Sequence, residues 1–260
     1  MDKRKIIYYE DELNDEFSVA VINPRRIDAD YKYIHTSPFK KFTHFFWYRI
    51  VATPLAFLYT KLKFGHRCVG REKLKAERGG YFIYGNHTQD IADALIPSML
   101  SFPKDAYLIV HPNNVSIRVI GKITPSLGAL PLPDDLKAYK SFISAVEKRY
   151  REGNAVFIYP EAHIWPYYTG IRPFRDDSFH YPVRYGAPVF CFTNTYHKRK
   201  HRREPRIVTY IDGPFYPDKT LPPKEARKAL RDEIYATMKK RAELSDISVI
   251  EYRRKDEKNG

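Results

Sequence analysis

The chain has 260 residues, of which 43% are hydrophobic, and this suits one large α/β domain rather than two small ones. Its two cysteines, Cys68 and Cys191, argue against a disulfide framework and have no metal-like spacing, which favours a reducing compartment. A formal net charge of +14 with 21 Tyr and 16 Phe indicates an anionic partner, which can be a nucleic acid, an anionic membrane or a phosphorylated ligand.

Residues 1–40 are polar and mixed in charge, and Pro24 with the two arginines after it interrupts any long period. We therefore expect an irregular N-terminal arm. The first residues lack the pattern of a signal peptide, because the basic residues 3–5 are followed by only four apolar or aromatic residues before Glu10. We expect the protein to stay in the cytoplasm.

Residues 41–66 form a segment of different character, crowded with aromatic and aliphatic side chains and flanked by lysines. Its longest uncharged run, Ile50 to Thr60, is far shorter than the roughly 20 residues that a membrane-spanning helix needs. An amphipathic helical segment can instead lie in the membrane interface, with aromatic groups in the lipid and lysines at anionic headgroups. The pattern also fits a helix packed on the domain's own core, and the two readings can hold for different faces.

A strand-to-helix corner follows, with a histidine where the periodicity changes. Tyr81 to Tyr84 is too short and too aromatic for a helix, whereas helical spacing appears further on, at Ile91, Ala94, Leu95 and Met99. His87 lies between the two patterns, where it can be exposed at the end of a sheet. A carboxylate one turn into the helix can hold its second ring nitrogen and fix its tautomer. The candidates for this carboxylate are Asp90 and Asp93.

Beyond this corner, apolar strands alternate with helical patterns, which predicts a mostly parallel central sheet flanked by helices. We expect strands at 106–111, 127–132, 155–159, 188–192 and 207–211, and helices at 136–150 and 222–244. The basic run 198–203 should be a hairpin tip or loop. Residues 67–244 would thus form the α/β domain, and residues 245–260 a loose polar tail.

The residues around His87 resemble the glycerolipid acyltransferase family, whose signature is N-H-x-x-x-x-D after an apolar strand. Asn86 and His87 match it, but Ala92 stands at the position of the aspartate. On a helix with about 100° per residue, positions 90 and 93 lie roughly 60° apart, so either carboxylate can face His87. We favour Asp93, because Asp90 is also explained as a first-turn acid that complements the helix dipole.

Weaker matches to the family follow in the same order, and the resemblance covers about residues 45–215. Residues 159–161 resemble the start of the F-P-E-G-T-R block, while residues 162–164 depart from it, and looser matches lie at 128–134, 173–179 and 186–190. The resemblance implies that Glu161 helps to build the acceptor pocket. Because the family's arginines are absent at two places, Arg172 and Arg175 become candidates for binding an acceptor phosphate, although both can equally be solvated loop cations.

The resemblance implies a glycerolipid O-acyltransferase that is peripheral or monotopic at the cytoplasmic face of an anionic membrane. The donor would be acyl-CoA or an acyl carrier protein, and the acceptor a lysophospholipid such as 1-acylglycerol-3-phosphate. His87 would accept the proton of the attacking hydroxyl while Asp93 orients the imidazolium, so that no metal and no cofactor are required. Glu161 should share the pocket of His87, because ligands bind beyond the carboxyl ends of parallel strands.

Other functions fit parts of the sequence. A nucleic-acid-binding or membrane-binding protein without catalysis would account for the basic and aromatic composition, but the ordered blocks at His87 and Glu161 disfavour nucleic acid as the partner. A thioester or lipid hydrolase could use the same His-Asp pair on water. A metal site at His197 and His201 is disfavoured, because the basic run 198–203 surrounds the pair and would repel a cation.

Overall fold

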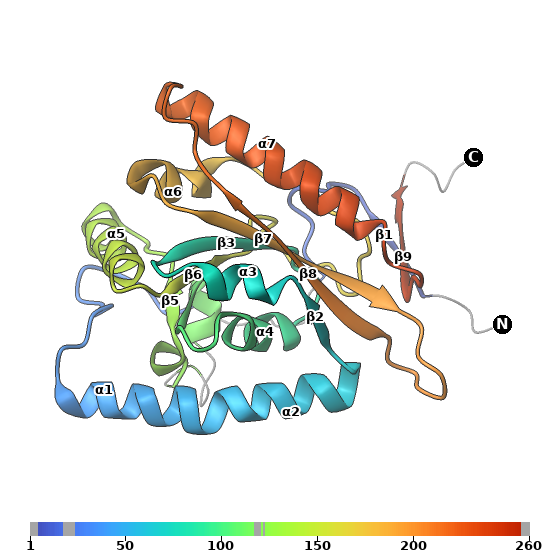
Figure 1. Ribbon diagram of the computed structural model, residues 1–260, viewed down its shortest axis with the longest axis horizontal. Coiled ribbons are helices and arrows are strands. Elements are labelled where there is room, and N and C mark those ends of the chain that lie inside the picture. The colour runs from blue at the N-terminus through green and yellow to red at the C-terminus, as the bar shows by residue number, and fades with distance from the viewer. Residues whose placement is uncertain (1–4, 18–23, 117–120, 122, 256–260) are drawn as a thin grey trace.

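The centre of the protein is a seven-stranded sheet with the strand order β2-β8-β7-β3-β6-β4-β5 (Figure 1). The computed structural model describes residues 5–17, 24–116, 121 and 123–255. Strands β7, β3, β6, β4 and β5 are parallel to one another, β8 is antiparallel to β7, and β2 is parallel to β8. The predicted α/β class with a mostly parallel sheet is thus confirmed. The strands are β2 (Arg67–Val69), β3 (Tyr81–Gly85), β4 (Ala106–Val110), β5 (Ala129–Pro131), β6 (Ala155–Ile158), β7 (Val189–His197) and β8 (Arg206–Phe215).

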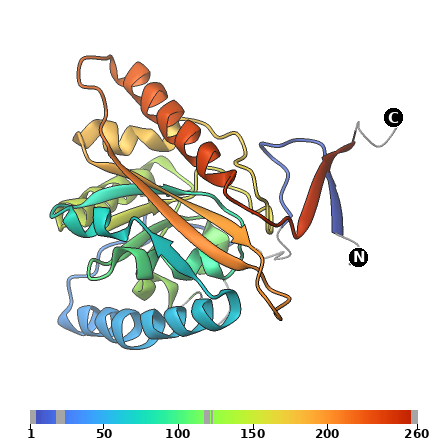
Figure 2. The same cartoon turned by 45° about the vertical axis from the view of Figure 1, so that its right-hand side comes forward.

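Side chains of the central strands alternate between two cores, because successive residues of a strand face opposite sides of the sheet. Phe82 and Tyr84 pack in the core beneath α5 (Leu136–Arg151), α6 (His180–Tyr185) and α7 (Pro223–Ala242). Tyr81 and Ile83 pack on the other face, with α3 (Arg71–Ala76) and α4 (Ala92–Ser101). Figure 2 shows the sheet between these two sets of helices. Both faces are covered, which explains the near-continuous apolar runs in β3 and β6.

The predicted amphipathic segment is one continuous helical run along an edge of the molecule, drawn in blue at the bottom of Figure 1. It consists of α1 (Pro38–Phe45), a π-helical stretch η1 (Phe46–Ala52) and α2 (Thr53–Phe64). Pro54 has no amide hydrogen to donate to the preceding turn, and the chain takes wider π-turns just before it. The run begins at Pro38 rather than at residue 41. No helix in the described part of the chain is both long and apolar enough to cross a bilayer.

The inner side of this helical run is fixed to the sheet through η1. The hydroxyl of Tyr48 accepts a hydrogen bond from the backbone amide of Ala106 at 2.6 Å. Arg49 forms an ion pair with Asp105, with a shortest N···O distance of 2.6 Å. The described part of the chain also has short 3₁₀ helices, namely η2 (Pro112–Val115), η4 (Thr124–Leu127) and η5 (Asp177–Phe179).

The N-terminal arm and the C-terminal tail are not irregular throughout, and the prediction is wrong where they pair. Strand β1 (Lys5–Tyr9) lies parallel to β9 (Ile250–Arg254) in a two-stranded sheet beside the main domain (Figure 1). The aromatic rings of Trp165 and Tyr252 stack at 4.8 Å between centroids and attach this sheet to the domain. Each strand is short and gains its partner only from the far end of the chain, so local patterns do not reveal it. Residues 1–4, 18–23 and 256–260 of the arm and tail lie outside the described residues.

Candidate active site

The corner after β3 depends on a glycine. A Cβ atom on Gly85 would lie 2.0 Å from Cζ of Phe192, so only glycine lets this ring pack against the end of β3. The Phe192 ring in turn meets the edge of Tyr159, with centroids 5.8 Å apart and an interplanar angle of 79°. Gly85 therefore allows the rings of Phe192 and Tyr159 to pack together next to the loop that carries His87.

Asn86 continues the sheet through its side chain rather than its backbone. Its Nδ2 donates to the carbonyl of Asn194 at 3.0 Å, and its Oδ1 accepts from the amide of Asn194 at 2.8 Å. Both residues are buried. Because the side chain takes over the hydrogen bonds of the ladder, the main chain can leave the sheet here and turn towards α4. His87 is the first residue beyond this point.

His87 is held by Asp93 and not by Asp90. The Nδ1 atom of His87 lies 2.9 Å from Oδ2 of Asp93, whose side chain is 1% exposed, while that of His87 is 18% exposed. The same Oδ2 accepts hydrogen bonds from the amides of Thr88 at 2.7 Å and Gln89 at 2.8 Å. Asp90 is exposed, and partial desolvation followed by the nearby charge of Asp93 raises its pKa. The carboxylate at position 93 thus fixes the imidazole.

The second support of His87 is Tyr159, the residue that follows β6. Its ring stacks on the imidazole with centroids 4.4 Å apart and an interplanar angle of 17°. Its hydroxyl donates a hydrogen bond to the backbone carbonyl of Asp93. Within the described part of the chain, Nε2 of His87 has no hydrogen-bond partner. The imidazole is therefore held by one nitrogen and one ring face, and its second nitrogen is left for another molecule.

A buried chain of polar groups extends behind Asp93, and sequence analysis missed it. Asn194 Nδ2 donates to Asp93 Oδ1 at 3.4 Å, and Thr209 Oγ1 donates to Asn194 Oδ1 at 2.6 Å. His66 Nε2 lies 2.8 Å from the same Thr209 hydroxyl. Burial lowers the pKa of His66 to about 4, so the ring is neutral at pH 7 and donates to Thr209. The available sequence signal was the presence of Asn194 and Thr209 within the apolar strands β7 and β8.

Glu161 and Arg172 form a fully buried ion pair, which corrects the expectation that Arg172 binds a phosphate. Arg172 Nε lies 3.3 Å from Oε2 of Glu161, and both side chains are 0% exposed. The guanidinium also donates to the carbonyls of Glu12, Glu161 and His163 and lies over the ring of Trp165 at 5.0 Å. Burial raises the pKa of Glu161, and the charge of Arg172 opposes this rise. Because the N-terminal arm helps to cover Arg172, its sequence neighbours alone could not show that it is enclosed.

Glu161 belongs to the loop that follows β6, and this loop supports the neighbouring loop after β3 that carries His87. Tyr84 lies opposite Ile158 in this parallel pair, so the residues that follow the two strands are neighbours. The amide of Trp165 donates to the carbonyl of His87 at 3.3 Å, and the amide of Tyr167 donates to that of Thr88 at 3.0 Å. The enclosed carboxylate of Glu161 holds this loop in place and does not line an open pocket.

Arg175 and His197 have other partners. Arg175 is exposed and pairs with Asp177 at 2.7 Å, next to η5, which packs against α7. His197 Nδ1 lies 3.0 Å from Asp246 Oδ2, and its Nε2 lies 2.8 Å from the hydroxyl of Thr195. The basic run 198–203 lies at the turn between β7 and β8, as predicted. Neither Arg175 nor His197 contacts His87, Asp93 or Tyr159 in the described part of the chain.

Comparison with known proteins was made against families, curated proteins and solved structures. Residues 66–193 match the model of the Acyltransferase family. No curated protein matches the chain. A solved structure with the same fold is the 1-acyl-sn-glycerophosphate (LPA) acyltransferase PlsC from Thermotoga maritima, with a TM-score of 0.54 and 19% sequence identity. The match covers 78% of this chain and 86% of that chain.

The matched stretch includes the two side chains that hold His87, whereas Asn194 and Thr209, which lie behind Asp93, come after its end. It contains β3, α4 and β6, and with them His87, Asp93, Tyr159 and Glu161. Residues 66–193 are therefore similar to the acyltransferase family, as the motifs around His87 and Glu161 indicated, and the chain has the fold of the PlsC structure.

Proposed function

We propose that the protein transfers a fatty acyl group from a thioester donor to the hydroxyl of a lysophospholipid, with His87 as the general base. One observation carries this proposal. The His87 imidazole is oriented through Nδ1 by the buried Asp93 carboxylate, while its Nε2 has no partner among the described residues, within an acyltransferase domain. This is the arrangement that a general base requires.

The proton steps follow from this geometry. Nε2 of His87 takes the proton of the acceptor hydroxyl as its oxygen attacks the thioester carbonyl carbon, and a tetrahedral intermediate forms. When the C–S bond breaks, the imidazolium donates this proton to the leaving thiolate. Asp93 keeps the proton of Nδ1 in place and stabilises the transient imidazolium. General base catalysis of this kind contributes about 10²- to 10⁴-fold in rate.

The oxyanion needs donors other than those nearest to His87. The amides of Thr88 and Gln89 already donate to Asp93 Oδ2, so they are not available for the developing negative charge. The remaining amides near the start of α4 are the groups that can supply it. No metal ion or cofactor takes part in the proposed reaction.

The proposed acceptor is a lysophospholipid such as 1-acylglycerol-3-phosphate, and the proposed donor is acyl-CoA or an acyl carrier protein. The acceptor is supported by the likeness to PlsC, which acts on 1-acyl-sn-glycerophosphate. Both donors are anionic, and the net charge of +14 suits either. Nucleic acid is not a proposed partner.

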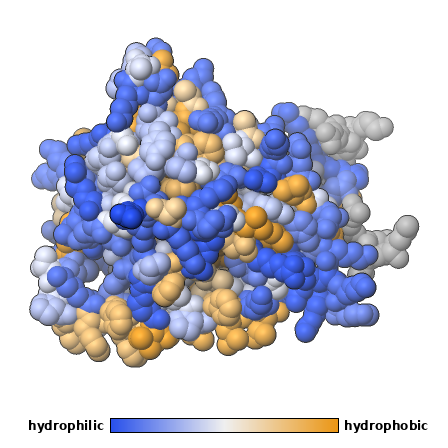
Figure 3. Space-filling view, viewed as in Figure 1, coloured by the Kyte–Doolittle hydropathy of each residue, from blue (hydrophilic) through white to orange (hydrophobic). Residues whose placement is uncertain are grey.

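The outer face of the α1–η1–α2 run supports a peripheral place on an anionic membrane, which we assign to the cytoplasmic face. Apolar side chains gather over these helices at the lower edge of Figure 3. The inner face of the same run packs on the core through Tyr48, Ala56 and Phe64, so the two faces have different roles. The exposed apolar side chains are Phe39, Phe42, Phe45, Phe46, Trp47, Ile50, Leu55, Phe57, Leu58 and Leu62.

A lipid analysis tests the proposed reaction. The protein is incubated with acyl-CoA or acyl carrier protein and a panel of lysophospholipids in anionic vesicles, and thiol release and new ester are both measured. We expect thiol release only when an acceptor is present, with one ester formed for each thiol. Thiol release without an acceptor would identify a hydrolase, and the absence of both products would favour a membrane-binding protein without catalysis.

A further inference from the structure

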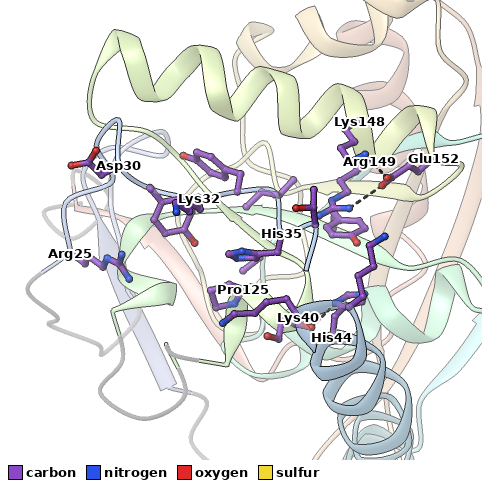
Figure 4. Close-up of a pocket in the computed structure, with 18 residues that line it drawn as sticks. Arg25, Asp30, Lys32, His35, Lys40, His44, Pro125, Lys148, Arg149 and Glu152 are labelled. Carbon is purple, nitrogen blue, oxygen red and sulfur yellow. Dashed lines mark hydrogen bonds and ion pairs between the residues drawn. The ribbon is translucent and has the colours of Figure 1, made fainter. Parts of the chain in front are cut away.

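A second candidate site lies at the amino ends of the parallel strands, whereas His87 lies at their carboxyl ends. It is a cavity of about 480 Å³, a size that suits a small ligand, between the chain at 25–36, helix α1 and the end of α5 (Figure 4). Residues near the amino ends of β4 and β5 line it, including Tyr107 and Ala129. His87, in contrast, follows the carboxyl end of β3. The cavity is therefore separate from the proposed site of acyl transfer.

The lining of this cavity is strongly cationic. Six lysines and arginines face only two carboxylates, Asp30 and Glu152. Glu152 is already paired, with Lys148 and with Arg149, at 2.9 Å in both cases. In the described part of the chain, no carboxylate lies within ion-pair distance of the four other cations. These are Arg25, Lys32, Lys40 and Lys41.

These cations lie close enough to act together. Figure 4 shows Arg25, Lys32, His35 and Lys40 around one space. After burial, the charges of Lys40, Arg149 and Lys32 are the causes that lower the pKa of His35. A bound anion would relieve such mutual repulsion.

One side of the cavity is held by ring contacts and carries an unsatisfied donor. The guanidinium of Arg149 lies over the ring of Tyr107 at 4.6 Å, and the ring of His44 is nearly parallel to Tyr107 with centroids 6.1 Å apart. His44 is itself held by the carbonyl of Ser126 at 2.7 Å. The buried Nε of Arg149 has no acceptor among the described residues. A fixed arginine with a free donor suits an oxygen-rich anion such as a phosphate group.

Helix α1 connects this cavity to the surface proposed to meet the membrane. At about 100° per residue, Phe39 and Phe42 of α1 and Phe46, the first residue of η1, fall on one side of the helical run, whereas Lys40 and His44 fall roughly a quarter turn or more away. Lys40 and His44 line the cavity, and the three phenylalanines are exposed. When the aromatic side lies among acyl chains, the mouth of the cavity is held beside the headgroup layer.

We propose that this cavity binds the phosphate headgroup of an anionic membrane phospholipid. The ligand's chemistry is that of a phosphate ester, and its source is the bilayer in which α1 lies. The proposal uses the membrane-facing surface of the proposed function but does not depend on acyl transfer.

Binding of dihexanoyl phosphatidic acid, a soluble probe, tests the proposal on the full chain, and it is followed at His35 in the cavity because this lipid is also the product expected at the His87 site. The pKa of His35, followed by NMR, should rise when the probe binds, because a bound anion favours the imidazolium. The variant Arg25→Gln/Lys32→Gln should weaken binding by about 30-fold, the loss expected for two cations beside a phosphate. Both residues are exposed and lie outside α1, so the variant should keep the fold and the apolar surface.

The matched control is Lys224→Gln/Lys228→Gln, which removes two exposed lysines from α7, across the sheet from α1 in Figure 1. It should bind the probe as the wild type does, and so should His87→Ala, which separates this test from that of the proposed function. Equal losses in the pocket and control variants would show unspecific charge attraction and overturn the proposal. An unchanged His35 pKa would overturn it as well.

The source of the phosphate is tested separately with inorganic phosphate and with vesicles of phosphatidylcholine, with and without phosphatidic acid. We expect weak binding of inorganic phosphate, and vesicle binding that depends on phosphatidic acid and is reduced in the pocket variant. Inorganic phosphate that binds as tightly as the lipid probe, with vesicle binding unchanged in the pocket variant, would show a site for free phosphate and reject the membrane lipid.

Discussion

At the scale of single residues, the proposed proton transfer depends on contacts that hold the His87 ring in one orientation. Asp93 Oδ2 receives three hydrogen bonds, one of them from His87, and Asp93 Oδ1 faces the amide group of Asn194. Tyr159 closes one face of the ring. These contacts come from β7, from α4 and from the loops that follow β3 and β6, so the position of the base depends on the packing of four elements.

Replacing Asp93 and Asp90 in turn should separate their roles. In Asp93→Asn the new amide nitrogen meets either His87 or the donor group of Asn194, and the tautomer of His87 is no longer fixed. We expect the rate of acyl transfer to fall about 10²- to 10⁴-fold. Asp90→Asn, the matched control three residues earlier, should retain most of the rate, because Asp90 is exposed and does not bond to His87. A larger loss in Asp90→Asn than in Asp93→Asn would refute this assignment.

The buried pair Glu161–Arg172 should behave as a structural unit. Arg172→Leu leaves the Glu161 carboxylate buried without its cation, and we expect unfolding in denaturant to show a loss of about 3–5 kcal/mol. The double variant Arg172→Leu/Glu161→Leu should recover much of that loss, because neither charge remains. If Arg172→Leu instead kept full stability and only raised KM for the acceptor, the arginine would be a substrate ligand after all.

At the scale of elements, the junction between α2 and β2 should make stability sensitive to acid. The pKa of His66 is lowered to about 4 from an ordinary value of 6.5. A histidine of this kind stabilises the fold fully above its unfolded pKa, and the contribution is lost as the pH falls from about 6.5 towards 4, a difference of about 3 kcal/mol. Its side chain is buried, so solvent screens this effect little.

The control for this prediction is His66→Gln, which can still donate to Thr209 but does not titrate. Unfolding in urea at about pH 7 and about pH 4 should show a smaller loss of stability in the variant than in the wild type, by about 3 kcal/mol. Parallel loss in both proteins would mean that other groups account for the acid sensitivity.

The elements themselves were largely predictable, and their partners were not. Strands β3, β4 and β6 and helix α5 lie within one or two residues of where periodicity placed them, because each has a strong local pattern. Strands β7 and β8 extend beyond prediction as one long antiparallel hairpin, in which the polar residues Asn194 and Thr209 lie opposite each other and share a hydrogen bond. The pair β1–β9 and the chain from Asp93 to His66 join distant residues, so no local pattern carries them.

At the scale of the whole molecule, apolar surface is concentrated on one edge, over the α1–η1–α2 run (Figure 3). We expect Phe45→Ser/Phe46→Ser/Trp47→Ser to weaken sedimentation with anionic vesicles at low salt. The three side chains are 54%, 41% and 37% exposed, so the variant should fold and keep its activity towards a soluble short-chain acceptor. Leu136→Ser/Leu244→Ser is the control, since both leucines are exposed away from this run, Leu136 at the start of α5 and Leu244 just after α7. A folded triple variant that still sediments fully would move the membrane contact to another surface, with the basic run 198–203 next to be tested.

The central claim is that this fold performs acyl transfer with His87 as its base, and the turnover of His87→Ala tests it most directly. The variant is compared with the wild type using the thioester donor and lysophospholipid that the wild type accepts. Denaturant unfolding and acceptor binding serve as controls. We predict that ester formation falls by about 10²-fold or more while folding and binding persist, because the side chain transfers a proton and its two neighbours, Asp93 and Tyr159, keep their other hydrogen bonds. Near-normal turnover in His87→Ala would contradict the mechanism.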